Sequence, residues 1–248
     1  MKLVLATGSD KGYYLRILPY LESIQTNSNF DENYLIYLDE EPIKSGFKKI
    51  KVSHIKMDDC KVINQNNCIQ HGEFLNSKEM MALEDEDIIC FTDGDIILQR
   101  RMSSGELELL RNLGDNDVLV GYNVSSDDTL YNEAMRLSYT GAVVPGLTDI
   151  DLRKIKVYNT GVLIMNKKTW WSVYEKYLEY WDRVDSMFTH YAKQQWLLSL
   201  IVNTMGYNVI EMSYQMHSHG HGGNPIGCYY KDSFAMNNGK KILFRHKL

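Results

Sequence analysis

The sequence predicts a single α/β domain in which helices cover both faces of a mainly parallel sheet. Short apolar runs alternate with segments of helical periodicity through the first half of the chain, which is typical of strand–helix–strand units. No internal repeat or compositional break divides the 248 residues. Hydrophobic residues make up 44% of the chain and charged residues 24%, with only 4 prolines, which excludes general disorder. We therefore treat residues 1–248 as one domain with a sizeable core.

The first elements follow from short apolar runs and from helical spacing between them. Residues 2–6 form an apolar run that predicts a buried strand, and residues 14–24 carry apolar side chains at helical spacing. Residues 34–38 and 50–55 predict two more strands, and residues 74–83 predict a helix. Because parallel strands need long crossover connections, this alternation favours a parallel sheet.

Further strands and helices are expected in the remainder of the chain. The apolar run at residues 88–91 predicts a continuous buried strand, and residues 117–121 and 157–165 predict two others. Residues 169–184 and 195–205 have helical spacing, and the first of these segments is rich in tryptophan and tyrosine. We expect these two helices to cover the sheet.

Charge and apolar content exclude several classes of protein. The formal net charge of −5 provides no whole-surface positive field for nucleic acid or anionic lipid, so we expect no nucleic-acid partner. The first apolar run is too short for a signal peptide, and no run approaches the roughly 20 residues of a transmembrane helix. We therefore expect a cytoplasmic protein without a transmembrane segment. The cysteines lack paired metal spacing and are expected to be reduced thiols: Cys60, Cys68, Cys90 and Cys228.

The most informative segment is Asp93-Gly94-Asp95, which directly follows the apolar run at residues 88–91. Residues two apart on an extended chain point to the same side, so both carboxylates can face one ligand while Gly94 permits close approach. Two adjacent carboxylates repel each other unless a cation bridges them, and oxygen ligands suit Mg²⁺ or Mn²⁺. Such an ion commonly takes phosphate oxygens as further ligands. The alternative is a plain turn, because aspartate and glycine are common in turns.

The order of motifs resembles that of glycosyltransferases with the GT-A fold, in particular family eight, which includes glycogenin and lipopolysaccharide galactosyltransferases. The acidic segment and Tyr158-Asn159-Thr160-Gly161, at the start of residues 158–166, are the distinctive parts of this resemblance. It implies a mainly parallel, Rossmann-like sheet, with a nucleotide-binding half at residues 1–121 and an acceptor-binding half at residues 122–248. It also implies metal-dependent transfer of a sugar from a UDP-sugar to an acceptor hydroxyl, such as one on a glycan.

The resemblance also implies roles for individual residues. Asp93 and Asp95 would bind Mn²⁺ or Mg²⁺ and the donor diphosphate, with Asp95 among the catalytic residues and Gly94 between them. Asn159 and Thr160 would line the sugar site, and Asn159 and Gln195 would be catalytic residues together with Asp95. The opening strand and the loop after it would hold the base and ribose, with the matching residues Ala6, Thr7, Gly8, Ser9, Asp10 and Tyr13.

Near residue 246 the family often carries a histidine that completes the metal shell. His246 fits this place, with Lys247 as a candidate phosphate contact, while His217, His219 and His221 compete for the metal. These three histidines lie in a glycine-rich segment, residues 216–227, that we interpret as a mobile loop.

One motif of the family is only partly kept. Its Asp-Gln-Asp helix start appears as Gln194-Gln195-Trp196, which retains the amide of Gln195 near the expected anomeric carbon but loses both acids.

Several alternatives remain open from the residues alone. Asp10 could cap the following helix instead of binding a ribose, and Tyr13 could pack instead of stacking on a base. The trio His217, His219 and His221 could hold zinc in a metal-dependent hydrolase. A third hypothesis is a noncatalytic nucleotide-sugar binder that lost turnover with the altered segment around Gln195.

Overall fold

The computed structural model places most of the chain around one large sheet. It describes residues 1–10, 12–38, 46–56, 60, 72–121, 129–136, 150–185, 193–218, 228–231 and 234–246. Within these residues, no helix combines the length and the apolar character needed to span a membrane.

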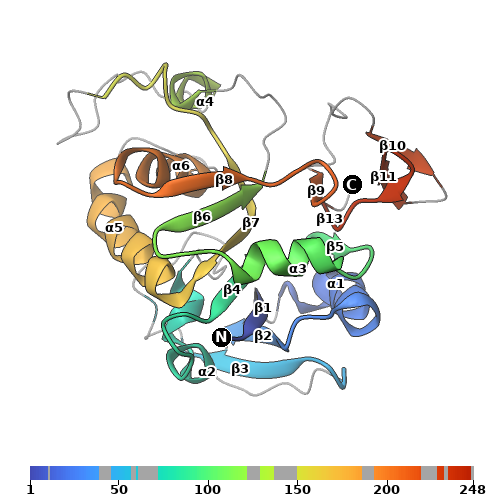
Figure 1. Cartoon of the computed structure of the whole chain (residues 1–248). Helices are drawn as coiled ribbons and strands as arrows, with labels where there is room; N and C mark the ends of the chain where they lie inside the picture. The colour runs from blue at the N-terminus through green and yellow to red at the C-terminus, as the bar shows by residue number, and fades with distance from the viewer. Residues whose placement is uncertain are drawn as a thin grey trace.

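A seven-stranded sheet in the order β3-β2-β1-β4-β7-β6-β8 forms the centre of the molecule (Figure 1). Every neighbouring pair is parallel except the two pairs that involve β7, so this one strand runs against the other six. The mainly parallel sheet predicted from the sequence is therefore confirmed. Its strands are β1 (Leu3–Asp10), β2 (Glu32–Leu38), β3 (Lys51–Ile55), β4 (Ile88–Thr92), β6 (Asp117–Gly121), β7 (Asn159–Asn166) and β8 (Asn208–Glu211).

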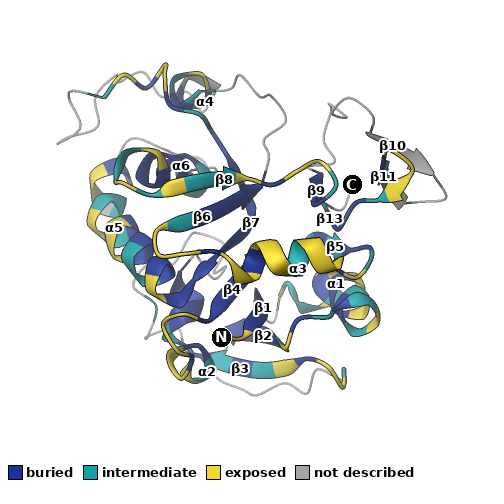
Figure 2. Cartoon of the chain, in the orientation of Figure 1, coloured by how far each residue is buried: buried dark blue, intermediate teal, exposed yellow. Residues whose placement is uncertain are grey.

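Helices cover both faces of this sheet, as the alternation of strands and helices predicts. α1 (Tyr14–Asn27) and α3 (Ser104–Arg111) pack on one face, with Ile17 and Leu110 in that core. The opposite face is covered by α4 (Leu130–Arg136), α5 (Lys167–Asp185) and α6 (Lys193–Thr204). Figure 2 shows β1, β4 and β7 buried between these layers, while the outer side of α3 is exposed.

The helix predicted over residues 74–83 is broken in the structure. A 3₁₀ helix at Glu73–Asn76 is followed by the single turn α2 (Lys78–Met81). Ser77 between them has an extended backbone, with φ −71° and ψ 145°, so the hydrogen-bonding pattern of one continuous helix is interrupted there. The apolar spacing that suggested one helix serves instead to bury Phe74, Leu75 and Met80 in the core.

Two small sheets are built from segments that the sequence pattern did not predict as strands. One has the order β5-β13-β9, and the other has the order β10-β11-β12. In the first, β13 pairs antiparallel with β5 and parallel with β9. The strands are β5 (Ile96–Leu98), β9 (His217–Ser218), β10 (Cys228–Lys231), β11 (Phe234–Asn237), β12 (Lys240–Lys241) and β13 (Phe244–His246).

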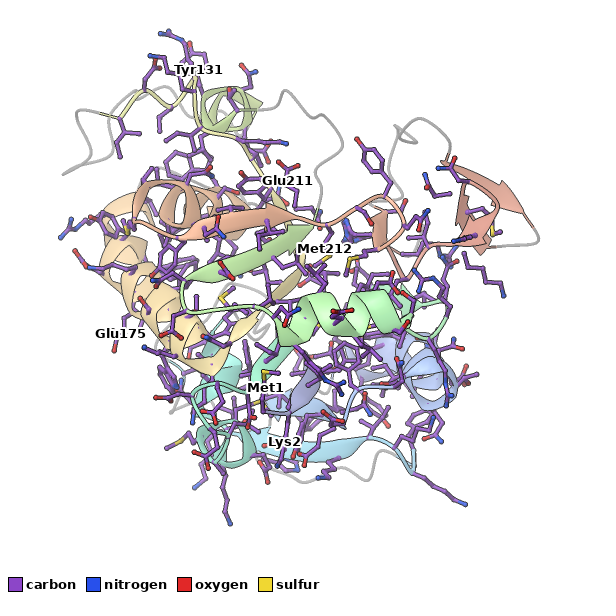
Figure 3. All side chains as sticks on the ribbon, viewed as in Figure 1. Met1, Lys2, Tyr131, Glu175, Glu211 and Met212 are labelled. Carbon is purple, nitrogen blue, oxygen red and sulfur yellow. The ribbon has the colours of Figure 1, made fainter. Side chains whose placement is uncertain are left out.

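The sheet β5-β13-β9 lies beside the end of the large sheet. Figure 3 labels Glu211 and Met212 at the end of β8, from which the chain runs on to β9. His217 and Ser218, in the segment predicted as a mobile loop, are buried in β9. Residues 219–227 of that segment lie outside the described residues.

Candidate active site

The acidic segment lies at a point where ligands commonly bind in open α/β sheets. β2 and β4 flank β1 on opposite sides, so the chain reverses its direction of strand addition between β1 and β4. Thr7 pairs with Thr92, which places Gly8 and Ser9 of β1 beside the residues that follow β4. The crevice outside the carboxyl ends of two such strands is the usual ligand site of open sheets. Asp93 and Asp95 are both half-buried there.

Packing fixes the turn that carries the two carboxylates. The Asp93 amide donates to the Gly161 carbonyl at 2.9 Å, and the Ile96 amide donates to the Asp93 carbonyl at 3.3 Å. A Cβ on Gly94 would lie 2.5 Å from Ile17 Cγ2 and 2.9 Å from Tyr13 Cε1. Gly94 is thus required by the close approach of α1, whereas the sequence had suggested close approach of a ligand. The segment is a turn, but one packed into the crevice.

Asn159 and Thr160 are consecutive residues at the start of β7, and their side chains point to opposite sides of the strand. The register between β6 and β7 shifts at Val120 and Gly121, where Gly121 pairs with Asn159. Thr160 lines a cavity of about 10 Å³, the space of one water molecule, together with Leu163 and residues of α6. Asn159 turns to the other side and contacts His246. The two residues that the resemblance assigned to one sugar site therefore point into different environments.

His246 is the candidate histidine that the structure brings to the acidic segment. The antiparallel pairing of β13 with β5 sets His246 opposite Ile96, directly after Asp95. His246 Nδ1 lies 3.6 Å from Asp95 Oδ1, and His246 Nε2 lies 3.1 Å from Asn159 Oδ1. Two of the three predicted metal ligands, Asp95 and His246, thus meet Asn159 in one place, and Asp95 and Asn159 are two of the three predicted catalytic residues.

Of the three competing histidines, the structure describes only His217. His217 is fully buried, and its ring stands edge-on to that of His246, with centroids 5.3 Å apart and planes at 81°. The parallel pairing of β9 with β13 produces this contact, because His217 is opposite Phe244, which lies two residues before His246 in β13. His219, His221 and Lys247 lie outside the described residues. Their predicted roles stay predictions.

The end of β1 and the turn after it are held by hydrogen bonds to β4 and within the turn. Ala6 and Thr7 are buried, and the Thr7 hydroxyl donates to the Thr92 carbonyl at 2.9 Å. Asp10 Oδ1 accepts the Tyr13 amide at 2.7 Å and so closes the turn before α1, whereas α1 itself has Tyr13 at its N-cap position and no side-chain cap. The Tyr13 ring is half-exposed, with the Arg16 guanidinium 5.9 Å from its centroid. Contact of these residues with a nucleotide stays a prediction.

Gln195 lies in the first turn of α6 and is half-buried. One turn further along, the Ser199 hydroxyl accepts the Tyr158 amide at 3.0 Å, which fixes α6 against the start of β7. Residues four apart share a helix face, so Gln195 lies on the side of α6 that faces this part of β7. Its predicted role near the anomeric carbon is compatible with this position but stays a prediction.

Buried neutral groups lie beneath the crevice. The Tyr20 hydroxyl is 2.5 Å from Thr92 Oγ1. Burial raises the pKa of Tyr20 well above its usual value, and the negative charge of Asp93 acts in the same direction. Burial likewise raises the pKa of the Cys90 thiol. Cys90 and Cys60 are free cysteines, and the side chains of the other two lie outside the described part of the chain.

The donor groups at the crevice fit a hard divalent cation in kind. Two carboxylates are ligands that Mn²⁺ and Mg²⁺ prefer in proteins, and an imidazole is a ligand typical of transition-metal ions. Asp95 and His246 already face each other, and Asp93 flanks them. Within the described ranges, however, no group of three or more histidine, cysteine, aspartate or glutamate side chains is arranged as a complete metal site. The crevice therefore provides the types of ligand that a metal site needs, but in this structure the side chains are not drawn together around one point.

Gly161 has a function at this site that the sequence analysis did not assign. A Cβ there would lie 2.5 Å from His246 Cε1 and 2.7 Å from His246 Nε2. The imidazole thus rests against the backbone of β7. The only signal in the sequence was the position of this glycine two residues after Asn159, which does not identify the distant residue it contacts.

Comparisons with known proteins identify the fold. No protein-family model matches the chain, and no curated protein does so. Among solved structures, the galactosyltransferase LgtC in complex with donor and acceptor sugar analogues matches with a TM-score of 0.58 and 14% sequence identity. The match covers 98% of this chain and 86% of LgtC. An active-site mutant of LgtC matches with a TM-score of 0.56, the same identity and the same coverage. The chain therefore has the GT-A fold of LgtC.

Proposed function

We propose that this protein is a metal-dependent glycosyltransferase that moves a sugar from a UDP-sugar to an acceptor hydroxyl on a glycan. The observation that carries the proposal is the pairing of β13 with β5, which sets His246 3.6 Å from Asp95 at the carboxyl ends of β1 and β4. The fold shared with LgtC, which was solved with donor and acceptor sugar analogues, supports both a sugar donor and a sugar acceptor.

Each part of the crevice has a proposed role. Asp93, Asp95 and His246 would hold Mn²⁺ or Mg²⁺, and a cation bound there would neutralise negative charge on the departing diphosphate. Gln195 would contact the transferred sugar and Lys247 a phosphate, while Thr160 would support the site from the internal cavity that it lines. Residues from 1–121, with the loop around Gly8 and the ring of Tyr13, would bind the nucleotide, and residues from 122–248 the acceptor.

The test is the release of UDP from UDP-glucose or UDP-galactose as Mn²⁺ is titrated. We expect the wild-type protein to release UDP only when Mn²⁺ is present, and Asp95→Asn to need a much higher Mn²⁺ concentration or to lose turnover. The matched control is Asp151→Asn, because Asp151 pairs with Lys154 at the surface and both side chains are largely exposed. Equal rates for wild type and Asp95→Asn would refute the metal role.

The same experiment separates the alternatives. UDP binding in the presence of Mn²⁺ without release of sugar would indicate a noncatalytic nucleotide-sugar binder. Zinc in the purified protein, together with no response to UDP-sugars, would indicate the histidine-centred hydrolase. Of the three histidines in that hypothesis, the structure describes only His217, which contacts His246.

A further inference from the structure

We propose that Asn159 is a positioning residue that fixes His246 in one tautomer, with the hydrogen on Nε2 and the lone pair of Nδ1 directed to the Asp95 side. The inference rests on the proposed function, because it makes Nδ1 of His246 the atom that would bind the cation. It also gives Asn159 a different role from the sugar contact that the resemblance implied.

The orientation of the Asn159 amide follows from a neighbour two residues away. The Gly161 amide lies 3.0 Å from Asn159 Oδ1 in hydrogen-bonding geometry. A backbone N–H can only donate, so the side-chain atom that faces it must be the acceptor oxygen and not the amide nitrogen. Both residues belong to the start of β7, so the Gly161 amide fixes the orientation of the Asn159 amide independently of His246.

The same oxygen then determines which nitrogen of His246 carries the hydrogen. Asn159 Oδ1 lies 3.1 Å from His246 Nε2, within the normal range for an N–H···O hydrogen bond. An amide oxygen has no hydrogen to donate, so Nε2 must be the donor. A neutral imidazole has only one N–H, which leaves Nδ1 as a bare lone pair.

Nδ1 is the nitrogen that faces the acidic segment. Its 3.6 Å separation from Asp95 Oδ1 is longer than a direct hydrogen bond. These two atoms would need only a small approach to hold one divalent cation together. Histidines that bind metals usually donate their other N–H to an oxygen acceptor, and this partner sets the tautomer and the ring orientation.

Packing holds the ring in the orientation that these contacts require. His246 and Asn159 are 6% and 3% exposed, which limits competition from water for the Asn159 oxygen. Gly161 lies against the ring, where a Cβ would come within 2.5 Å of Cε1. The edge-on contact with His217 lies at 5.3 Å between ring centroids.

The test reads the tautomer directly in the metal-free protein. Histidine is labelled with ¹⁵N, and long-range ¹⁵N–¹H correlation spectra are recorded at alkaline pH, where imidazole is neutral. The His246 signals are assigned by their loss in His246→Gln. We expect the wild-type spectrum to show a protonated Nε2 and a bare Nδ1. Asn159→Ala should show a mixture of tautomers, whereas Asn159→Asp keeps an acceptor oxygen and should retain the wild-type tautomer.

Asn203→Ala is the matched control, because Asn203 bonds the Lys156 and Ser199 carbonyls and receives a hydrogen bond from the Tyr158 hydroxyl. It should leave the His246 signals unchanged. A second readout is Mn²⁺ binding, followed by the electron paramagnetic resonance signal of the free ion. Asn159→Ala should weaken Mn²⁺ binding on the order of 10–100-fold, as loss of an outer-shell partner does, and Asn159→Asp should restore it.

A wild-type spectrum with the hydrogen on Nδ1 would overturn the proposal, as would an Asn159→Ala spectrum identical to wild type. If Asn159→Ala does not fold, Asn159→Leu, which keeps the size of the side chain but has no acceptor oxygen, replaces it, and a wild-type tautomer in that variant would likewise overturn the proposal. Failure of the proposed function looks different, because the predicted tautomer would then be observed in a protein that releases no UDP from UDP-sugars.

Discussion

Replacing Gly161 with alanine tests the contact between β7 and the imidazole of His246. The new Cβ would lie 2.5 Å from His246 Cε1, whereas carbon atoms in contact prefer about 3.5–4.0 Å, so the ring must retreat by about 1 Å. The ring is almost fully buried and has His217 beside it, so the retreat requires repacking. Overpacking of this kind costs about 1–3 kcal/mol. For a domain of this size each kcal/mol lowers Tm by about 2–4 °C, so we expect a fall of about 2–12 °C.

The assay combines thermal unfolding, followed by circular dichroism, with Mn²⁺ titration. A retreat of 1 Å also breaks the 3.1 Å contact between His246 Nε2 and Asn159, so Mn²⁺ binding should weaken by about tenfold or more. Gly105→Ala is the matched control, because a Cβ at this position in α3 meets no atom within 4 Å. It should leave Tm unchanged or raise it, since alanine is favoured over glycine in helices. If Gly161→Ala melts and binds Mn²⁺ like the wild type, the imidazole does not rest on β7.

Three further substitutions test the support of the crevice. Gly94→Ala should lower Tm and impair Mn²⁺ binding, because its Cβ would lie 2.5 Å from Ile17 Cγ2 and displace the acidic turn; unchanged binding would contradict this packing. Burial raises the pKa of Glu106, but hydrogen bonds from Arg100 and from the helix cap outweigh it and lower the net pKa below 4.5. The ionised form of Glu106 therefore stabilises the protein above about pH 4.5, and this contribution is lost as the pH falls through the lower pKa of the folded state. In urea unfolding Glu106→Gln should cost about 1 kcal/mol at pH 7 and less in acid, and a pH-independent difference would show that the charge is irrelevant. Tyr20→Phe removes one buried hydrogen bond and should lower the unfolding free energy by about 1 kcal/mol, whereas a value near zero would indicate that the 2.5 Å contact contributes nothing.

The large sheet could be predicted from the sequence because its strands are long apolar runs. Residues 88–91 are apolar throughout, and the structure buries them as part of β4 between two layers of helices. The position of Asp93 and Asp95 at the end of this strand followed from the same run. α3 was missed although its signal was present, because Ser103 and Glu106 form a capping box that can be recognised by its spacing.

The small sheet at the crevice could not be predicted in the same way. β5 and β13 have three residues each and β9 has two, which is too short for a periodic pattern to stand out. Their pairing depends on contacts between distant parts of the chain, so the resemblance suggested His246, but only the structure showed its approach to Asp95. The opposite directions of the Asn159 and Thr160 side chains follow from strand alternation, which the sequence could have predicted, whereas the register shift between β6 and β7 leaves no periodic signal.

β13, which carries His246, is held to its neighbouring strands by few residue pairs. β13 pairs with β5 through three residue positions and with β9 through two, whereas β1 pairs with β4 through five. Segments with few pairings open at lower free energy than a central sheet does. His246 can therefore detach from Asp95 and Asn159 while the seven-stranded sheet remains intact. Amide exchange in β13 should accordingly run ahead of exchange in β4, and loss of cation binding on heating should precede loss of helical ellipticity.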